Sequence, residues 1–225
     1  MHQLNLIWII AIKDLKVEYR SKQAFLTALF LTILILIIFV FAFDPGSAAT
    51  REASPGILWV AFLFPGVIQL NRSFQSEVDE GTIYGLTLAP VERGVIFLGK
   101  MLANWIFLMM VNLVLLAAFV VFFNFNFNFR ILWIALLILL SGIGFTAVGT
   151  LFAAMVSNVR TREMLLPILL FPILVPIILA AVNATQEVLL HGEMPYLFRS
   201  IQLLVAFDLI FTAAGFLVFD YVLGE

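Results

Sequence analysis

The chain has 225 residues, of which 64% are apolar and 12% are charged, and its formal net charge is -2. Soluble domains have about 45–50% apolar and about 25% charged residues, so this sequence has more apolar side chain than a soluble core of its length could bury. The composition indicates an integral membrane protein, and with no basic patch it favours no nucleic-acid partner. The absence of cysteine excludes disulfides, cysteine-based zinc sites and haem attachment through Cys-x-x-Cys-His.

Residues 4–22 precede the first long apolar run and carry bases and apolar residues at helical spacing. The bases are Lys13, Lys16 and Arg20, and Glu18 lies four residues before Lys22. The apolar side includes Leu4, Ile7, Trp8, Ala11 and Leu15. This pattern predicts a helix in the cytoplasmic membrane interface, with tryptophan at headgroup depth and bases toward anionic lipid. The alternative is a solvated leader before the first span.

Six apolar runs are long enough to cross a bilayer, because about 20 helical residues span a hydrocarbon core of about 30 Å. They are residues 24–43, 53–71, 101–129, 131–159, 164–186 and 201–223. The runs are continuous and not alternating, which favours helices over a β-barrel. The first run is longer than the core of a signal peptide, so we expect a retained span. We predict an all-α integral membrane protein, with residues 1–23 as an N-terminal cytoplasmic or interfacial helix and residues 24–225 as a six-helix transmembrane domain.

Lysine and arginine are distributed unequally between the two sides of this arrangement. One side holds Lys13, Lys16, Arg20, Lys22, Arg72, Arg93, Lys100, Arg160 and Arg162, and the other holds Arg51, Arg130 and Arg199. Because cytoplasmic loops carry the excess of bases, both termini are predicted to be cytoplasmic.

The segment between the second and third spans, FQSEVDEGTIYGLTLAPVERGVIFLGK, is polar in an otherwise apolar chain. It contains an acidic cluster, Glu77, Asp79 and Glu80, followed by a helix break at Gly81 and a helix cap at Thr82. Leu86 and Pro90 belong to the partly apolar connector that follows. A connector of this kind predicts a docking surface for a partner.

The residues from Gly94 to Lys100 fit the spacing G-x-x-x-x-G-K of a phosphate-binding loop. Met101 stands where that motif needs serine or threonine, and no strand precedes it. We therefore expect no nucleotide site here, and we expect Lys100 to extend to the lipid headgroups at the start of the third span.

Three spans contain residues for which gating is one interpretation. Pro167, Pro172 and Pro176 predict either a flexible fifth helix near a moving interface or ordinary kinks, and Pro65-Gly66 in the second span has the same two interpretations. Asp208 lies about seven residues, roughly 10 Å, into a sixth span that starts near residue 201. It is either a substrate or gating contact, or an anchor near the outer interface, and this placement favours the anchor.

The outer segments carry two further patterns. Residues 124–129 alternate asparagine and phenylalanine, and their position between two spans favours an aromatic turn over a strand. Residues 189–197 are expected to be an outer loop containing His191 and Met194, both of which are haem-ligand types. A lone histidine in a loop is more often a surface residue, so we expect His191 to bind no haem. No motif predicts catalysis, so we expect no enzyme.

Three motifs carry a resemblance to a known family. Glu77, Gly81-Thr82, Leu86 or Leu88, Pro90 and Gly99-Lys100 resemble the segment joining spans two and three in ABC-2-type transporter permeases. The stretches PGILWVA at 55–61 and LLPILLFPILVP at 165–176 resemble, more narrowly, the CcmB family, haem exporter protein B, the membrane subunit of the cytochrome c maturation ABC complex. The resemblance covers essentially the whole chain.

The resemblance implies an ABC-2-type permease fold in which a segment at about 74–92 contacts a separate ATPase. The residues with this implied coupling role are Glu77, Asp79, Glu80, Gly81, Thr82, Leu86 and Pro90. It also implies ATP use through a CcmA-like ATPase, no directly bound cofactor, a second copy of the chain, CcmC-like and CcmD-like haem-handling subunits, a CcmE-like haem chaperone, and a bacterial inner membrane with its lipid. The function would be haem export or release of haem-loaded chaperone. A drug or polysaccharide permease and a non-transporting assembly scaffold are the alternatives.

The predicted topology has a direct test. A reporter that is active only outside the cytoplasm should be inactive when fused after Glu225, because an even number of spans returns the chain to the base-rich side. Reporter activity in whole cells is the measurement, and a fusion within residues 44–52 should be active. An active fusion after Glu225 would rule out the even-span arrangement.

Overall fold

The computed structural model describes residues 2–43, 47–74, 78, 91–125, 129–157, 159, 161–191 and 194–222. The helices within these residues are α1 (His2–Ser21), α2 (Gln23–Ala42), α3 (Ala48–Ser73), α6 (Arg93–Phe122), α7 (Arg130–Val156), α8 (Arg162–Gln186), the π-helix η1 (Glu187–His191) and α9 (Met194–Val222). Six of them are long and apolar enough to cross a membrane: α2, α3, α6, α7, α9, and α8 continued into η1. The predicted all-α architecture with six membrane-length helices is confirmed.

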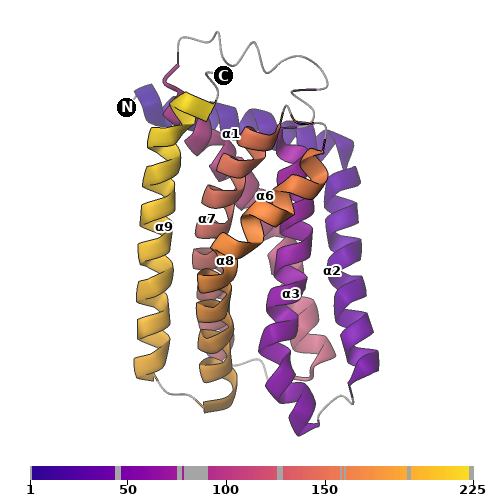
Figure 1. The fold of residues 1–225 in the computed structure, drawn as a ribbon. Helices are drawn as coiled ribbons and strands as arrows, with labels where there is room; N and C mark the ends of the chain where they lie inside the picture. The colour runs from indigo at the N-terminus through magenta and orange to yellow at the C-terminus, as the bar shows by residue number, and fades with distance from the viewer. Residues whose placement is uncertain are drawn as a thin grey trace.

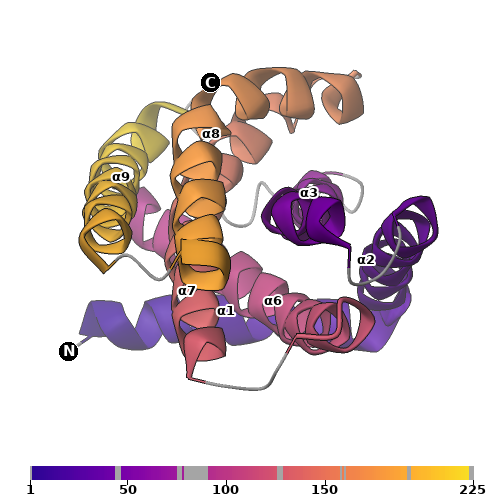
Figure 2. The same ribbon diagram turned by 90° about the horizontal axis from the view of Figure 1, so that it is seen from below.

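The six long helices form an upright bundle, and α1 lies across one of its ends (Figure 1). We call this end the α1 end. The last turns of α3, α7 and α9 and the first turns of α6 and α8 lie there too, so every described base predicted for one side of the membrane belongs to this end. The view along the bundle shows α7 among the other helices and α2 at the edge (Figure 2). Accordingly, α3 and α7 are the most buried of the six, and α2 and α9 are among the least buried.

The predicted N-terminal helix is present as α1. It packs against α6, and its Ala11 is fully buried. Trp8 and Leu4 are more than half exposed, which leaves apolar surface available to lipid. These features suit a helix lying at a membrane surface, although its placement in the interface stays a prediction.

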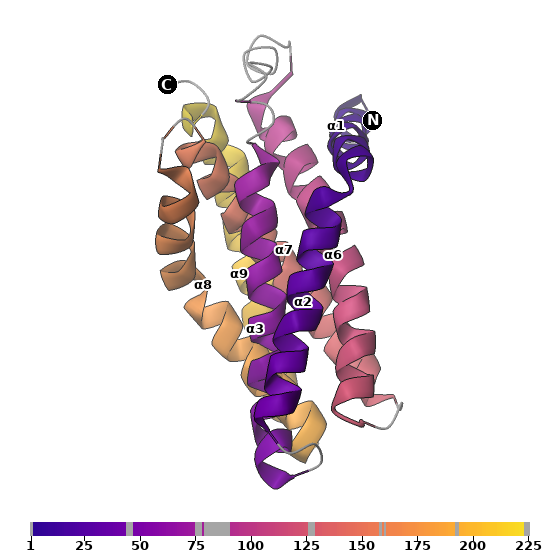
Figure 3. The same ribbon diagram turned by 90° about the vertical axis from the view of Figure 1, so that its right-hand side faces the viewer.

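Helix α8 is bent, as Figures 1 and 3 both show. It contains Pro167, Pro172 and Pro176, each of which removes a backbone hydrogen bond and clashes with the preceding turn. Pro172 and Pro176 are exposed, whereas the opposite face of the helix buries Leu166, Leu170 and Leu174. The prolines therefore curve the helix without occupying its packed face.

Packing explains the glycine of the Pro65-Gly66 pair in α3. Gly66 of α3 faces α7, and a Cβ atom added there would lie 2.7 Å from the ring of Phe145. Phe145 is itself buried and contacts Phe62 edge-to-face, at 5.5 Å between ring centroids. Only glycine allows this close approach of α3 and α7, so Pro65-Gly66 needs no hinge to explain it.

Two boundaries differ from the sequence prediction. The sixth span begins at Met194 and not near residue 201, and η1 makes much of the predicted 189–197 loop helical. Pro195 fits this earlier start, because a proline in the first helical turn loses no backbone bond that the helix would make. The third span begins at Arg93, so the whole 94–100 stretch is helical.

The outer end of α6 agrees with the prediction of an aromatic turn. The helix ends at Phe122, and Asn124 has a φ of 52°, a left-handed conformation that asparagine tolerates well. The rings of Phe119 and Phe125 stack across this turn at 5.4 Å between centroids. Residues 126–128 lie outside the described part of the chain.

Candidate functional site

The coupling residues predicted from sequence lie in the segment between α3 and α6. Glu77, Asp79, Glu80, Gly81, Thr82, Leu86 and Pro90 all fall outside the described residues. What the structure describes is the base of this segment, where it leaves α3 at Phe74 and returns to α6 through Glu92. The Val78 amide donates to the Phe74 carbonyl over 3.1 Å, which is a helical hydrogen bond beyond the last residue of α3.

Lys100 ties three helices together at this base. Its side chain is fully buried, and its Nζ donates to Oδ2 of Asp14 on α1 over 3.3 Å. The same Nζ lies 3.5 Å from the Ser73 carbonyl oxygen at the end of α3 and 4.4 Å from the ring centroid of Phe74. A buried ammonium needs such partners, because an uncompensated charge out of water is very costly. We call Lys100, Asp14, Ser73 and Phe74 the Lys100 cluster.

Further contacts join α1 to the same region. Gln69 of α3 donates to the Glu18 carboxylate over 3.1 Å, and Gln3 donates to the Glu92 carboxylate over 3.1 Å. Gly99 allows the close packing, because a Cβ atom there would lie 2.7 Å from Cβ of Ile10. Helix α1 is thus fastened to both helices from which the predicted coupling segment departs.

The Lys100 cluster corrects one prediction. Lys100 does not extend to the headgroups, because Asp14 of a distant part of the chain draws its ammonium inward. The stretch from Gly94 to Lys100 lies entirely within α6, so its amides are committed to a helix and do not form the cradle of a phosphate loop.

Asp208 lies at the middle of α9, fourteen residues from Met194 and fourteen from Val222. At 1.5 Å per residue this is about 21 Å from either end of the helix. The interpretation as an anchor near the outer interface is therefore wrong, because it depended on a later start for the helix.

The carboxyl group of Asp208 is enclosed between helices. Only 6% of the residue is exposed, and neither carboxylate oxygen has a hydrogen-bond partner of good geometry among the described residues. Glycine at 144 on α7 makes room for it, since a Cβ atom there would lie 2.5 Å from Oδ1 of Asp208 and 2.7 Å from Ile177 of α8. The nearest polar group of the neighbouring helix is the Gly144 backbone, which gives the carboxyl no hydrogen bond of good geometry. An acidic group so poorly satisfied inside a membrane bundle is costly, and such groups are commonly functional.

Helices α8 and α9 also border a pocket of about 510 Å³ at the end of the bundle away from α1. Its lining includes Pro176 and Asn183 from α8, Glu187 from η1, and Tyr196 and Arg199 from α9. The sequence assigns Arg199 to the outer side of the membrane, but no sequence pattern places it in a pocket. The pairing of α8 with α9 that creates the pocket is a tertiary feature that no local pattern indicates.

His191, a haem-ligand residue type that we expect to bind no haem, is the last residue of η1. The structure describes its backbone only. Among the residues that the structure describes, no group of three or more histidine, aspartate or glutamate side chains is arranged to hold a metal ion.

Comparison with known proteins places this bundle in a family. The sequence matches the family described as CcmB protein over residues 5–219. The chain belongs to the CcmB family. Two relatives named Heme exporter protein B are 24% identical over 183 residues in Pseudomonas aeruginosa, covering 81% of each chain, and 25% identical over 187 residues in Haemophilus influenzae, covering 82% of each chain. A third, from Rhodobacter capsulatus, is 25% identical over 73% of this chain and 75% of its own.

The CcmB match includes every helix that forms the base of the predicted coupling segment. It begins before Asp14 and ends after Asp208, so both the Lys100 cluster and the buried carboxyl belong to the matched region. The motifs in the sequence therefore predicted the family correctly, while the residues that pair with Lys100 or surround Asp208 became apparent only in three dimensions.

The Lys100 cluster yields a stability prediction. Asp14→Asn should lower the free energy of unfolding by about 3 kcal/mol, because it leaves the buried Lys100 ammonium without its carboxylate. Asp14→Leu combined with Lys100→Met should recover much of this loss, since apolar replacements remove both charges. The measurement is the thermal unfolding midpoint of the purified protein in detergent.

Lys13→Gln is the control for the loss of charge on α1, because Lys13 is exposed while its Nζ lies 3.1 Å from Asp14. It should change the midpoint little, as expected for a solvent-screened pair. An Asp14→Asn variant as stable as the wild type would show that α1 is not held by this ion pair.

Proposed function

We propose that this chain is the membrane subunit of an ABC transporter of cytochrome c biogenesis, in which a separate CcmA-like ATPase drives haem export or the release of haem-loaded chaperone. The observation that carries the proposal is membership of the CcmB family in a chain with six membrane-length helices. Relatives named Heme exporter protein B match most of the chain, which supports haem as the compound handled. Both termini then lie in the cytoplasm of a bacterial inner membrane.

In this proposal the chain hydrolyses no ATP and binds no cofactor itself. ATP is used by the partner ATPase, and haem is handled by the assembled complex. The complex also contains a second copy of the chain, CcmC-like and CcmD-like subunits and a CcmE-like chaperone. The helical conformation of the 94–100 stretch supports a separate ATPase, because it presents no phosphate-binding loop.

The segment at about 74–92 is the proposed contact with the ATPase, with Glu77, Asp79, Glu80, Gly81, Thr82, Leu86 and Pro90 as its coupling residues. The geometry at its base supports this role. Because Lys100 joins the end of α3, the first turns of α6 and the middle of α1, a force on the segment would act on all three helices together. Residues 1–23 would then belong mechanically to the transmembrane domain of residues 24–225.

The moving part is proposed to be the interface of α7, α8 and α9. Asp208 is buried there without a good hydrogen-bond partner among the described residues, so this arrangement is less stable than one that hydrates or pairs the carboxyl. Pro167, Pro172 and Pro176 already remove hydrogen bonds from α8, which makes further bending of that helix less costly. A second arrangement of these helices would open a route along the bundle.

The acidic cluster gives the sharpest test of coupling. Replacing Glu77, Asp79 and Glu80 together with lysine should leave membrane insertion intact but abolish ATPase retention and cytochrome c maturation, because like charges would then face the basic rim expected on the partner. The measurement is co-purification of the ATPase in detergent, alongside the membrane abundance of the variant.

A neutral triple variant, which combines Glu77→Gln, Asp79→Asn and Glu80→Gln, is the graded control and should retain more ATPase than the lysine variant. Full ATPase retention and full maturation in the lysine variant would show that the acids form a solvated face and that docking lies elsewhere, for example around residues 157–163.

Asp208 provides the test of gating. Asp208→Leu should raise the free energy of unfolding by about 1–3 kcal/mol, because it removes an unsatisfied buried polar group while keeping the branched shape. The same variant should lose maturation activity. Without the unsatisfied carboxyl, the observed arrangement of α7, α8 and α9 would be more stable, and the change to a second arrangement would be more costly. The measurements are the unfolding midpoint in detergent and the yield of mature cytochrome c, with Asp208→Asn as the closer structural analogue. A Leu variant that is stabilised yet fully active would remove Asp208 from the mechanism.

A further inference from the structure

A small apolar cluster lies apart from the main core, at the elbow where α1 turns into α2. Ala24 and Ala28 of α2 pack there against Phe107 and Val111 of α6. The ring of Phe25 meets Phe107 edge-to-face, at 5.9 Å between centroids. The elbow itself is formed by Lys22, whose φ of 50° is unusual for a residue other than glycine.

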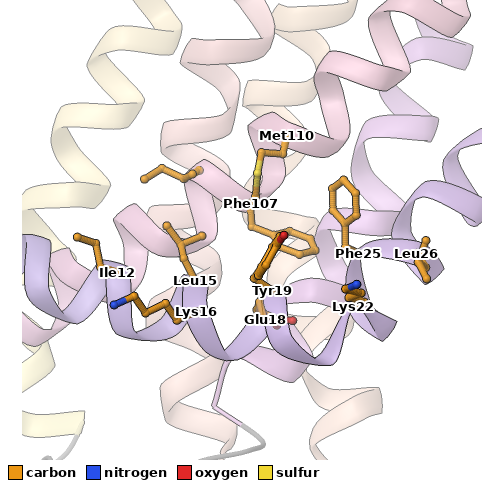
Figure 4. A pocket seen from close by; sticks show the side chains of 11 residues that line it. Ile12, Leu15, Lys16, Glu18, Tyr19, Lys22, Phe25, Leu26, Phe107 and Met110 are labelled. Carbon is orange, nitrogen blue, oxygen red and sulfur yellow. The ribbon is translucent and has the colours of Figure 1, made fainter.

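Beside this cluster the structure contains a pocket of about 620 Å³, which we call the elbow pocket. Figure 4 shows Phe107 and Met110 of α6 facing Leu15 and Tyr19 of α1, with Phe25 of α2 beside them. The pocket therefore lies between the second half of α1, the start of α2 and the stretch of α6 from Ile106 to Met110. Its wall is almost entirely apolar, so it suits a hydrocarbon chain better than a polar solute or an ion.

The polar groups of the elbow pocket are positive at its edge. Lys16 and Lys22 contribute to its lining, and both are exposed and have no ion-pair partner among the described residues. By contrast, Lys13 on the same helix lies 3.1 Å from the Asp14 carboxylate. The one acid of the lining, Glu18, accepts a hydrogen bond from Gln69 of α3. The two lysines are thus available to an external anion.

We propose that the elbow pocket binds an anionic phospholipid, with an acyl chain against Phe107 and Met110 and the phosphate at Lys16 and Lys22. The pocket combines an apolar interior with cationic edges on a helix that lies across the end of a membrane bundle. A basic site between a surface helix and membrane spans favours an anionic headgroup, and burial of the chain adds affinity along its length. The proposal requires α1 to lie at the membrane surface, but it depends neither on haem nor on an ATPase.

Lipid selectivity tests the headgroup part. The full chain is purified, exchanged into detergent containing phosphatidylglycerol and phosphatidylcholine, and analysed by native mass spectrometry for retained lipid. The wild type should retain phosphatidylglycerol preferentially, and Lys16→Gln should reduce that preference about fivefold, which corresponds to one lysine near an anionic surface. Lys22→Asn should act similarly, because asparagine removes the charge yet tolerates the left-handed conformation.

Arg20→Gln is the matched control for the lysine variants. Arg20 is an exposed base on α1 that does not line the pocket, so its loss should leave the lipid preference unchanged. An equal reduction in Arg20→Gln and Lys16→Gln would mean that the helix attracts anionic lipid only through its overall charge, which would overturn the proposed site.

Filling the pocket tests the acyl-chain part without changing any charge. Met110 is partly exposed within the pocket, so Met110→Trp should reduce retention of both lipids. Leu113→Trp is the control, because Leu113 is exposed on α6 but does not line the pocket. Unchanged retention of both lipids in Met110→Trp would overturn the proposal. If that variant also loses self-association, the occupant of the pocket is a second copy of the chain and not a lipid.

Added phosphatidylglycerol should raise the unfolding midpoint of the wild type but not that of the Lys16→Gln and Lys22→Asn double variant, because a ligand stabilises the state that binds it. The unfolding midpoints without lipid show whether each variant is folded. If phosphatidylglycerol does not raise the midpoint of a wild-type protein that retains the ATPase normally, the lipid site is rejected and the proposed transport function is not affected. If the protein binds lipid normally but does not retain the ATPase, only the proposed transport function is contradicted.

Discussion

The burial of one charge, the ammonium of Lys100, constrains the whole α1 end of the protein. A buried cation needs a carboxylate, and Asp14 on α1 supplies it at 3.3 Å. Helix α1 therefore has to pack on α6, which in turn requires glycine at position 99, where any side chain would meet Ile10. The same ammonium lies close to the end of α3. The N-terminal helix is thus part of the bundle at the place where the polar 74–92 segment begins and ends.

Asp208 differs from Lys100 in having no good hydrogen-bond partner, and the two residues lie in different regions of the molecule. Lys100 has hydrogen-bond and aromatic partners, whereas the Asp208 carboxyl packs against glycine and apolar side chains without a good hydrogen bond from the described residues. A buried charge with its partners favours one geometry, whereas a buried polar group without good hydrogen bonds makes its geometry less costly to leave. Lys100 lies among α1, α3 and α6, and Asp208 lies among α7, α8 and α9, where α8 also contains three prolines. This division favours a rigid part that receives force and a more deformable part that responds.

The sequence predicted the number and type of helices, because hydropathy and length decide whether a helix crosses a bilayer. It failed at Lys100, since the tendency of lysine to reach water is a local rule and Asp14 is 86 residues away along the chain. It failed at Asp208 for another reason. The last apolar run predicts a span that starts near residue 201, but the helix begins at Met194, where Pro195 fits the first turn. This earlier start places Asp208 at the middle of the helix and not in its outer part. Family motifs were informative because they include tertiary constraints that periodicity does not contain.

The elbow between α1 and α2 links these observations to the bilayer. Helix α1 is held near its middle by Asp14, and its last turns lead through Lys22 into α2, one of the least buried spans. A lipid in the elbow pocket would contact α1, α2 and α6 together, whereas the Lys100 cluster joins α1, α3 and α6. Helices α1 and α6 belong both to the Lys100 cluster and to the elbow pocket, whereas α2 belongs only to the pocket. A displacement of the 74–92 segment that moves α1, α3 and α6 together would therefore shift α1 relative to α2, unless the elbow also moves. A lipid in the elbow pocket would resist that shift, because it would pack against Phe25 and Leu26 of α2 as well as against α1 and α6, whereas an empty pocket would permit it.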